Sequence, residues 1–368
     1  MSLSDHKPSS LLAMPVAEPA RQVKLDLAVS RFENEREFER LRRNLSAVET
    51  DGKHIWLAGD EGLFLERLTR PGKPAVYADH RRTSLAEAFD LSTDDGEIDL
   101  EGLSKDGSRL WILGSHCLTR KSAEKAAEKE GAADALDGMK IRKRRKAINR
   151  CLLGCLDLTP NADAGADAAP RPLAKLRFTE TGSELLDVLA EDDQLAPFLK
   201  LPAKENGLDF EGIAVRGETA FIGLRGPVIG GLALIVELRL RMDEAAGTLR
   251  LGKLDNGRLY AKHAFDLQGL GIRDLAFRGK DLLMLAAPTM ALDGIAAVFR
   301  WRPEERAESG GIADPGQYGA MLRLPGGDRG NYAEGITVLD GQLLVVCDQL
   351  GDGSLDASGA VILNSFKI

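Results

Sequence analysis

The sequence predicts an all-β fold, a β-propeller of five blades with six blades as the alternative. The first observation is a repeated phrase, in which two short apolar strands flank a turn that contains glycine. Glycine after a polar residue between two apolar runs is typical of a hairpin turn, because glycine accepts a positive φ. The second observation is spacing: the anchor residues of successive copies lie 55, 110, 63 and 60 residues apart. The copies span residues 44–62, 99–117, 209–227, 272–289 and 332–350.

Further strand-like runs complete each blade. The fifth copy is one strand short, and residues 23–32 are predicted to supply it and so to close the ring. A charged segment at about 120–148 is predicted as a helical insertion in the second blade. We expect residues 1–21 to be a flexible tail and 22–368 to form a single domain. The other predicted outer strands are 63–69, 75–79, 150–158, 172–178, 232–240, 258–267, 296–303, 319–325 and 360–368.

Composition limits the class of protein. The chain has 368 residues, of which 43% are hydrophobic and 29% charged, so it can bury a core. It contains no apolar run long enough for a membrane span, and its first residues do not resemble a secretory signal. The formal net charge of −8 argues against a general nucleic-acid binder. Four cysteines in this length form no disulfide framework, which favours a reducing cytoplasm.

An acidic position recurs at the start of the predicted first strands, which line the central channel of a propeller. We expect these acids to gather in a ring there. Such a ring must hold a proton, pair with a cation or remain hydrated. The cation could be internal, with Arg225 and Arg273 as candidates, or it could be Ca²⁺ or Mg²⁺, which favour oxygen ligands. The acids, which are the tentative metal ligands, are Glu101, Glu211, Asp274 and Glu334.

Two other roles for the repeated acids stay open at this point. They could accept hydrogen bonds from backbone N–H groups of the neighbouring blade and hold the blades together. They could also form a polar site for a small anionic or polar ligand. The second strands return to the same face, so their ends add further candidates for ligand contacts. These candidates are Asp60, Ser115, Arg225, Arg273 and Asp348.

Two residues are candidates for catalysis. His116 follows Ser115 at the end of a second strand and could act as a general base, although a hydrogen-bonded histidine with no role is the more common case. Arg225 could clamp a carboxylate or a phosphate, or it could neutralise Glu211. A third feature, the basic run 139–150, could bind a protein partner or cover the acidic face.

The repeats resemble a known group of proteins. The segments DLEGLSKDGSRLWILGSH, LDFEGIAVRGETAFIGLRGP, LGIRDLAFRGKDLLMLAAPTMALDG and YAEGITVLDG are similar to the bacterial domain-of-unknown-function 3616 family. The Glu-Gly phrase is also similar to that of phytase-like, esterase-like and SdiA-regulated propellers. The resemblance implies a propeller and, in some relatives, calcium or phosphoester chemistry. It implies no reaction for the family itself.

The sequence thus leads to two functional hypotheses. The first is a cytoplasmic propeller whose acidic channel mouth binds a ligand or a metal, and which could be a metal-assisted hydrolase of phosphate or carboxylate esters. The second is a non-catalytic scaffold whose acidic ring is structural, with protein partners on its loops or on the basic insertion.

Overall fold

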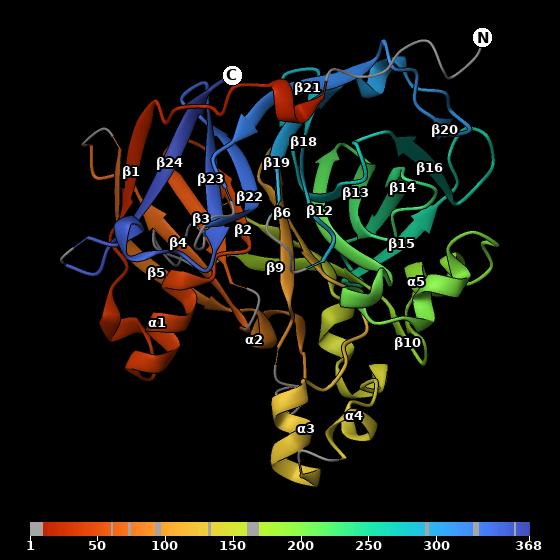
Figure 1. Ribbon diagram of the computed structural model, residues 1–368, viewed down its shortest axis with the longest axis horizontal. Helices are drawn as coiled ribbons and strands as arrows, with labels where there is room; N and C mark the ends of the chain where they lie inside the picture. Colours follow the sequence, from red (N-terminus) through yellow and green to blue (C-terminus); the bar gives the residue numbers. More distant parts are fainter. Residues whose placement is uncertain are drawn as a thin grey trace.

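The computed structural model describes residues 10–59, 62–72, 75–92, 97–131, 134–159, 169–290, 294–326, 331–356 and 358–368. Within these residues the chain is mainly β, and its strands form curled, mainly antiparallel sheets that stand side by side in a propeller-like arrangement (Figure 1).

Four strands that follow one another in the chain form each of the first two units. The first contains β2 (Ala47–Thr50), β3 (His54–Ala58), β4 (Phe64–Thr69) and β5 (Val76–Ser84). The second contains β6 (Leu100–Asp106), β7 (Arg109–Gly114), β8 (Leu153–Asp157) and β9 (Arg171–Leu176).

The next two units repeat this order, and the third has one additional strand. The third contains β12 (Asp209–Arg216), β13 (Thr219–Gly226), β14 (Ala233–Asp243), β15 (Thr248–Gly252) and β16 (Tyr260–Phe265). Its outer strand is divided, because β14 pairs with β15 over one half and with β16 over the other. The fourth contains β17 (Gly271–Arg278), β18 (Asp281–Ala287), β19 (Ala296–Trp301) and β21 (Tyr318–Leu324).

The two ends of the chain meet in the last unit. It contains β22 (Tyr332–Leu339), β23 (Gln342–Asp348), β24 (Val361–Lys367) and β1 (Arg21–Leu25). Here β1 is antiparallel to β24, with Val23 opposite Leu363, as the sequence analysis expected of an N-terminal strand. β1 also pairs in parallel with β5, so the joint between the last and first units has no open edge. The strand is shorter than predicted, since Val29–Arg31 form a 3₁₀ turn.

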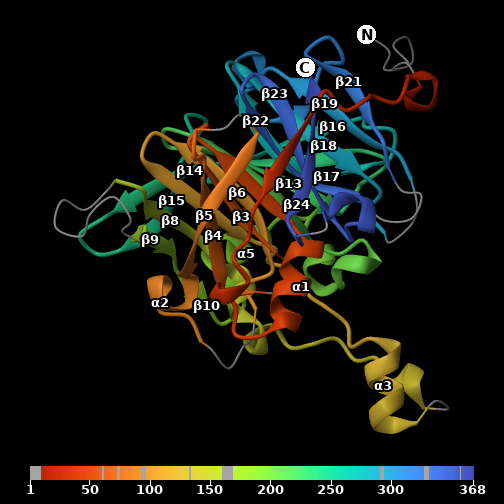
Figure 2. The same ribbon diagram turned by 90° about the vertical axis from the view of Figure 1, so that its left-hand side faces the viewer.

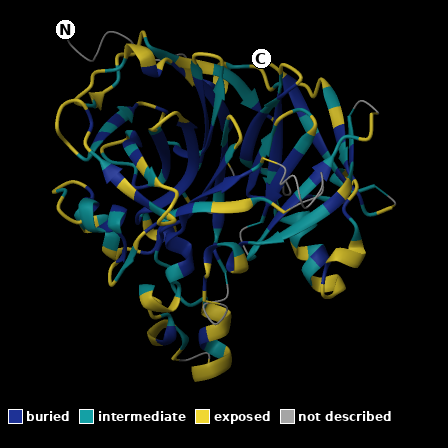
Figure 3. Cartoon of the chain, turned by 180° about the vertical axis from the view of Figure 1, so that it is seen from behind, coloured by how far each residue is buried: buried dark blue, intermediate teal, exposed yellow. Residues whose placement is uncertain are grey.

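The first strands of neighbouring units pack against one another around the centre. β2 contacts β6, β6 contacts β12, β12 contacts β17, β17 contacts β22, and β22 contacts β2. The hairpin glycines predicted for each unit have positive φ, as at Gly217, where φ is 59°. Large apolar side chains such as Trp301 and Phe265 fill the space between units, and Figure 3 shows the buried strands surrounded by more exposed loops.

The segment before β1 is partly packed. Residues 1–9 of the predicted tail lie outside the described residues. Leu11 is 2% exposed and belongs to the cluster that contains Phe265 and Trp301. The backbone N–H of Ala17 donates to the carbonyl of Arg323. Leu11 and this hydrogen bond therefore anchor the segment along the fourth unit.

Short helices lie outside the sheets. The insertion in the second unit contains α3 (Ala123–Glu130) and α4 (Ala135–Gly138), and it projects away from the body (Figures 1 and 2). The remaining helices are α1 (Glu35–Arg43), α2 (Leu85–Phe89) and α5 (Glu184–Leu189), and two short strand pairs involve β10 (Phe178–Thr179), β11 (Gly182–Ser183) and β20 (Gly311–Ile312). In the part of the chain that the structure describes, no helix has the length and apolar character needed to cross a membrane.

Candidate functional site

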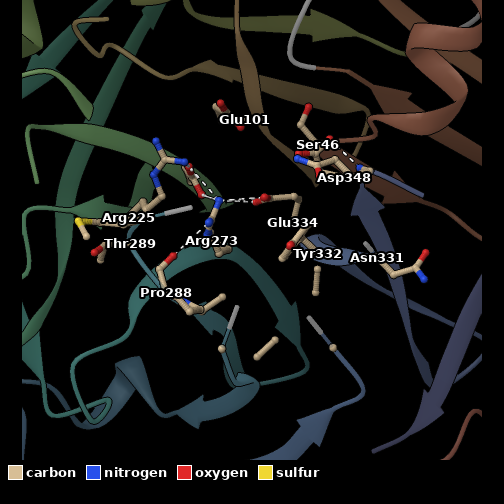
Figure 4. Close-up of a pocket in the computed structure, with 18 of the residues that line it drawn as sticks. Ser46, Glu101, Arg225, Arg273, Pro288, Thr289, Asn331, Tyr332, Glu334 and Asp348 are labelled. Carbon is tan, nitrogen blue, oxygen red and sulfur yellow. Dashed lines mark hydrogen bonds and ion pairs between the residues drawn. The ribbon is translucent and has the colours of Figure 1, made fainter. Parts of the chain in front are cut away.

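A β-bulge near the start of the first strand places one extra side chain at the centre of the molecule. The strand register shifts at the equivalent point in four units, and a bulge turns the extra residue out of the ladder. Ser46, just before β2, is the fifth residue of this set. All five line one cavity of about 320 Å³ (Figure 4). The bulged residues are Glu101, Glu211, Arg273 and Glu334.

The glycine that follows the bulge explains the repeated Glu-Gly phrase. A Cβ on Gly212 would lie 2.6 Å from the Cα of Asp274, and one on Gly335 would lie 2.8 Å from the carbonyl oxygen of Ser46. Both distances are too short for a real contact. The glycine thus allows neighbouring first strands to approach closely, while the residue before it faces the cavity.

Asp274 does not enter the cavity, which differs from the predicted ring of acids. By strand register it takes the position of the glycine, and Arg273 takes the position of the glutamate. Asp274 is 1% exposed, and its Oδ2 accepts a hydrogen bond from the backbone N–H of Ile336 at 2.7 Å. Burial raises the pKa of this carboxyl well above its ordinary value. Asp274 therefore links the fourth unit to the fifth, which is the structural role that the sequence analysis left open for the acids.

Two arginines hold the acids of the cavity. Nη1 of Arg273 lies 2.7 Å from Oε2 of Glu334 and 3.1 Å from Oε2 of Glu211. Nη1 of Arg225, at the end of β13, lies 2.8 Å from Oε1 of Glu211, and its Nη2 pairs with Asp209. Burial lowers the pKa of Arg225, but the charges of Asp209 and Glu211 outweigh burial and raise it well above its ordinary value. Both sequence-predicted internal cations thus take part in the site.

Carboxyl groups outnumber basic groups in the lining. Glu101, Glu211, Glu334 and Asp348 face Lys204, Arg225 and Arg273, which makes four acids against three bases.

The shortage of positive charge leaves a proton in the cluster. Burial raises the pKa of Glu334 to about 8, with Arg273 acting against this rise and Glu211 adding to it. Burial also raises the pKa of Asp348, and it raises that of Asp209 to about 7. At neutral pH Glu334 therefore carries a proton, although 14% of its side chain is exposed at the cavity.

A resident Ca²⁺ or Mg²⁺ does not fit this arrangement. Oxygen ligands of the right kind are present, but the guanidinium of Arg273 occupies the space between Glu211 and Glu334 that a bridging cation would need. Within the described ranges, no group of three or more His, Cys, Asp or Glu side chains is placed to hold a metal ion.

Comparison with known proteins gives a family. The chain matches the family described as "Protein of unknown function (DUF3616)" over residues 44–364. The chain belongs to this family. The matched range includes every residue of the site described above, and among curated proteins none matches the chain.

Solved structures resemble the chain only weakly. Glutaminyl cyclase of Myxococcus xanthus has a TM-score of 0.41 at 10% identity, with 96% of this chain and 97% of that chain covered. The Malassezia sympodialis allergen Mala s 1 has a TM-score of 0.43 at 11% identity, again with 96% and 97% covered.

Two other candidates lie away from the cavity of this DUF3616 protein. His116 is fully buried, its Nδ1 is 2.8 Å from the carbonyl of Gly114, and burial lowers its pKa to about 4. A neutral, enclosed imidazole cannot exchange protons with a ligand in the cavity. Ser115 is also fully buried, and its carbonyl accepts a hydrogen bond from the N–H of Phe210. Asp60 lies outside the described residues.

The basic insertion does not cover the acidic cavity. None of its residues lines the cavity, and two of its arginines turn back to the body. Arg150 pairs with Glu97 at 2.6 Å and also with Asp99, and Arg144 donates to the carbonyls of His116 and Leu199.

Sequence reasoning missed Asp209, Lys204 and Asn331. A signal for Asp209 existed, because Asp-Leu-Glu and Asp-Phe-Glu both place an aspartate two residues before the bulged glutamate. Each aspartate pairs with an arginine, Asp99 with Arg150 and Asp209 with Arg225. Lys204 lies in the short 3₁₀ helix Ala203–Glu205, and Asn331 lies just before β22. Neither position belongs to the repeat, so no sequence pattern marked them.

Proposed function

We propose that the four-stranded units are the five blades of one propeller, and that the cavity at its centre binds a small polar molecule without negative charge. The observation that supports this proposal is that four bulged residues from four units and Ser46 from the first unit line one cavity. The cavity volume of about 320 Å³ is at the lower end of the range for small-molecule sites, so the cavity suits a small ligand.

The charges of the lining argue for the class of ligand. Arg273 and Arg225 already bind carboxyl groups of the protein, so neither is free to clamp an anion. The acids exceed the bases by one in the lining. A neutral hydrogen-bonding group, or a cation that replaces the proton of Glu334, matches this balance better than a carboxylate or a phosphate does.

Glu334 supplies the chemistry in this proposal. A carboxyl group that keeps its proton near neutral pH and reaches a cavity is suited to general acid catalysis. In the hydrolysis of an uncharged ester, Glu334 would give its proton to the leaving-group oxygen as the C–O bond breaks. A water molecule would add its oxygen to the carbonyl carbon, and its released proton would return to Glu334. These reaction steps require no metal ion.

The test compares an uncharged ester with an anionic one. We would measure turnover of ethyl acetate, whose alkoxide leaving group needs a proton, and of ethyl phosphate by the wild type, by Glu334→Gln and by the matched surface control Glu304→Gln, whose side chain is 57% exposed. The proposal predicts turnover of the acetate that falls at least about 100-fold in Glu334→Gln, since general acids contribute 10²–10⁴-fold. Glu304→Gln should match the wild type, and the rate should fall above about pH 8.

Preference for the phosphate, or full activity in Glu334→Gln, would contradict the proposed chemistry. Absence of turnover for both esters would remove the hydrolase proposal and would favour the scaffold hypothesis.

A further inference from the structure

A second, larger cavity lies on the outer side of the third unit. It has a volume of about 910 Å³ and shares no lining residue with the central cavity. It is bordered by the chain after α5, by β16 and by β20, which lie together on the right of Figure 1. Its size falls within the range of about 300–1,000 Å³ that is usual for small-molecule sites.

The strand pattern gives the cavity an aliphatic wall. Side chains alternate along β16, so Lys262 and Ala264 face the cavity while His263 is buried beneath. Ala264 lies opposite Leu234 of β14 and also opposite Ile312 of β20, which places these three side chains on one face of the sheet. Ile312 is 54% exposed, so this apolar face is open to an incoming molecule.

A tight turn forms another part of the lining. Ile229 and Leu232 exchange two backbone hydrogen bonds of 3.0 Å across Gly230 and Gly231. Both glycines have positive φ, 60° and 86°, which such a two-residue turn requires. The turn presents Ile229 and Leu232, both half-buried, to the cavity.

The lining also contains a cluster of polar side chains, Asp192, Gln194, Tyr260 and Lys262, in which the two charges cancel. Glu191 and Arg258, both exposed, line the cavity as well and add one charge of each sign. Nζ of Lys262 is 2.6 Å from Oδ2 of Asp192 and 2.7 Å from Oε1 of Gln194. The hydroxyl of Tyr260 donates to Asp192, which leaves the phenolic oxygen as an acceptor. Asp192 is thus saturated and Lys262 is neutralised, so neither attracts a charged ligand.

The geometry points to a binding site for an uncharged, largely apolar small molecule with one hydrogen-bonding group. Its apolar body would lie between Leu232 and Ile312, and its polar group would reach Tyr260. The charge balance at Asp192 and Lys262 selects against carboxylates and ammonium groups, because either would have to break the existing pair.

The test uses N-phenyl-1-naphthylamine, an uncharged dye that fluoresces in apolar sites. The wild type should give a saturable increase in fluorescence. Ile312→Asp and Leu232→Glu should each weaken the apparent affinity at least tenfold. Ile312 is exposed, so its substitution should leave the fold intact, which the thermal midpoint would verify. The control is Leu136→Asp on α4, where an even more exposed leucine, at 80%, should be replaced without effect.

Competition tests the charge of the ligand. 1-Octanol should displace the dye at least tenfold more effectively than octanoate or octylammonium. The inference is overturned if the dye shows no saturable binding, if both cavity variants bind it as the wild type does, or if the charged competitors equal the alcohol. Because this cavity is separate from the central one, Glu334→Gln should bind the dye normally.

Discussion

Replacement of Arg273 by methionine tests the ion-pair network at the centre of the molecule. Methionine keeps much of the volume of the side chain but removes the charge that Glu211 and Glu334 share. The side chain of Arg273 is only 11% exposed, so solvent cannot replace the lost partner fully.

The expected loss of unfolding free energy depends on the burial of Arg273 and on the charge partners that Glu211 and Glu334 keep without it. Removal of one partner of a buried ion pair costs about 3–5 kcal/mol of unfolding free energy. Glu211 keeps Arg225, at 2.8 Å, whereas Glu334 loses Arg273, its ion-pair partner at 2.7 Å, and retains the weaker effect of the charge of Arg225. We therefore expect a loss near the lower limit, about 3 kcal/mol at pH 8.

The loss should depend on pH. The pKa of Glu334 in the folded protein is raised to about 8, above its ordinary 4.5, so between these values the folded state binds more protons than the unfolded state. Stability then falls as pH rises, by up to about 1.4 kcal/mol per pH unit for one proton. Arg273 lowers this pKa, and its removal should extend the fall to higher pH. The variant should therefore lose less at pH 5.5 than at pH 8.

Urea unfolding followed by tryptophan fluorescence would measure this difference at both pH values. Arg241→Met, at a side chain that is 55% exposed, is the control and should change stability by no more than about 0.5 kcal/mol. Addition of Glu334→Gln to Arg273→Met should recover part of the loss, because the amide needs no counter-charge. A loss below about 1 kcal/mol, or a loss that is equal at both pH values, would refute the reasoning.

Three further outcomes follow from the structure. Asp274→Ala should cost about 1–3 kcal/mol in urea unfolding, because the N–H of Ile336 loses its buried acceptor, while Asp274→Asn should cost less; equal losses would argue against the hydrogen bond. Gly212→Ala should cost about 1–3 kcal/mol, since its Cβ would meet Asp274, whereas Gly319→Ala, with open space around it, should be close to neutral; similar values for the two would contradict the close approach. Addition of Ca²⁺, Mg²⁺ or EDTA should leave the thermal midpoint unchanged, and a rise with either ion would show that a metal site exists.

Much of the architecture could be predicted because the two strands of a hairpin and their turn are close together in the sequence. The phrase around Gly217 contains both strands of one hairpin and its turn, so it predicts β12 and β13 without knowledge of the rest of the chain. The divided outer strand of the third unit was not predicted. β15 is short, and its pairing with β9 of the second unit is set by the tertiary arrangement rather than by local pattern.

The sequence predicts that acids from several units meet, but the residue it assigns to the site in the fourth unit, Asp274, is one position too far along the strand. Convergence of the acids followed from the repeat, and Glu101, Glu211 and Glu334 do line one cavity. Asp274 was assigned to the ring because it is acidic, although Ile272 and Leu275 show that it aligns with glycine. Alignment on the apolar residues, which the core fixes, would have placed Arg273 at the bulge. The burial of His116 could not be predicted, because Phe210, which packs at 5.1 Å, comes from another unit.

Direct titration of Glu334 is the sharpest test of the central claim that the central cluster retains a proton. Carbon-13 NMR of side-chain carboxyl groups, in protein labelled at glutamate, would follow each resonance with pH, and Glu334→Gln would identify the signal. The structure predicts one glutamate that titrates near pH 8 and is absent from the variant. A Glu334 resonance that titrates between about pH 4 and 5, like an exposed carboxyl group, would contradict the account.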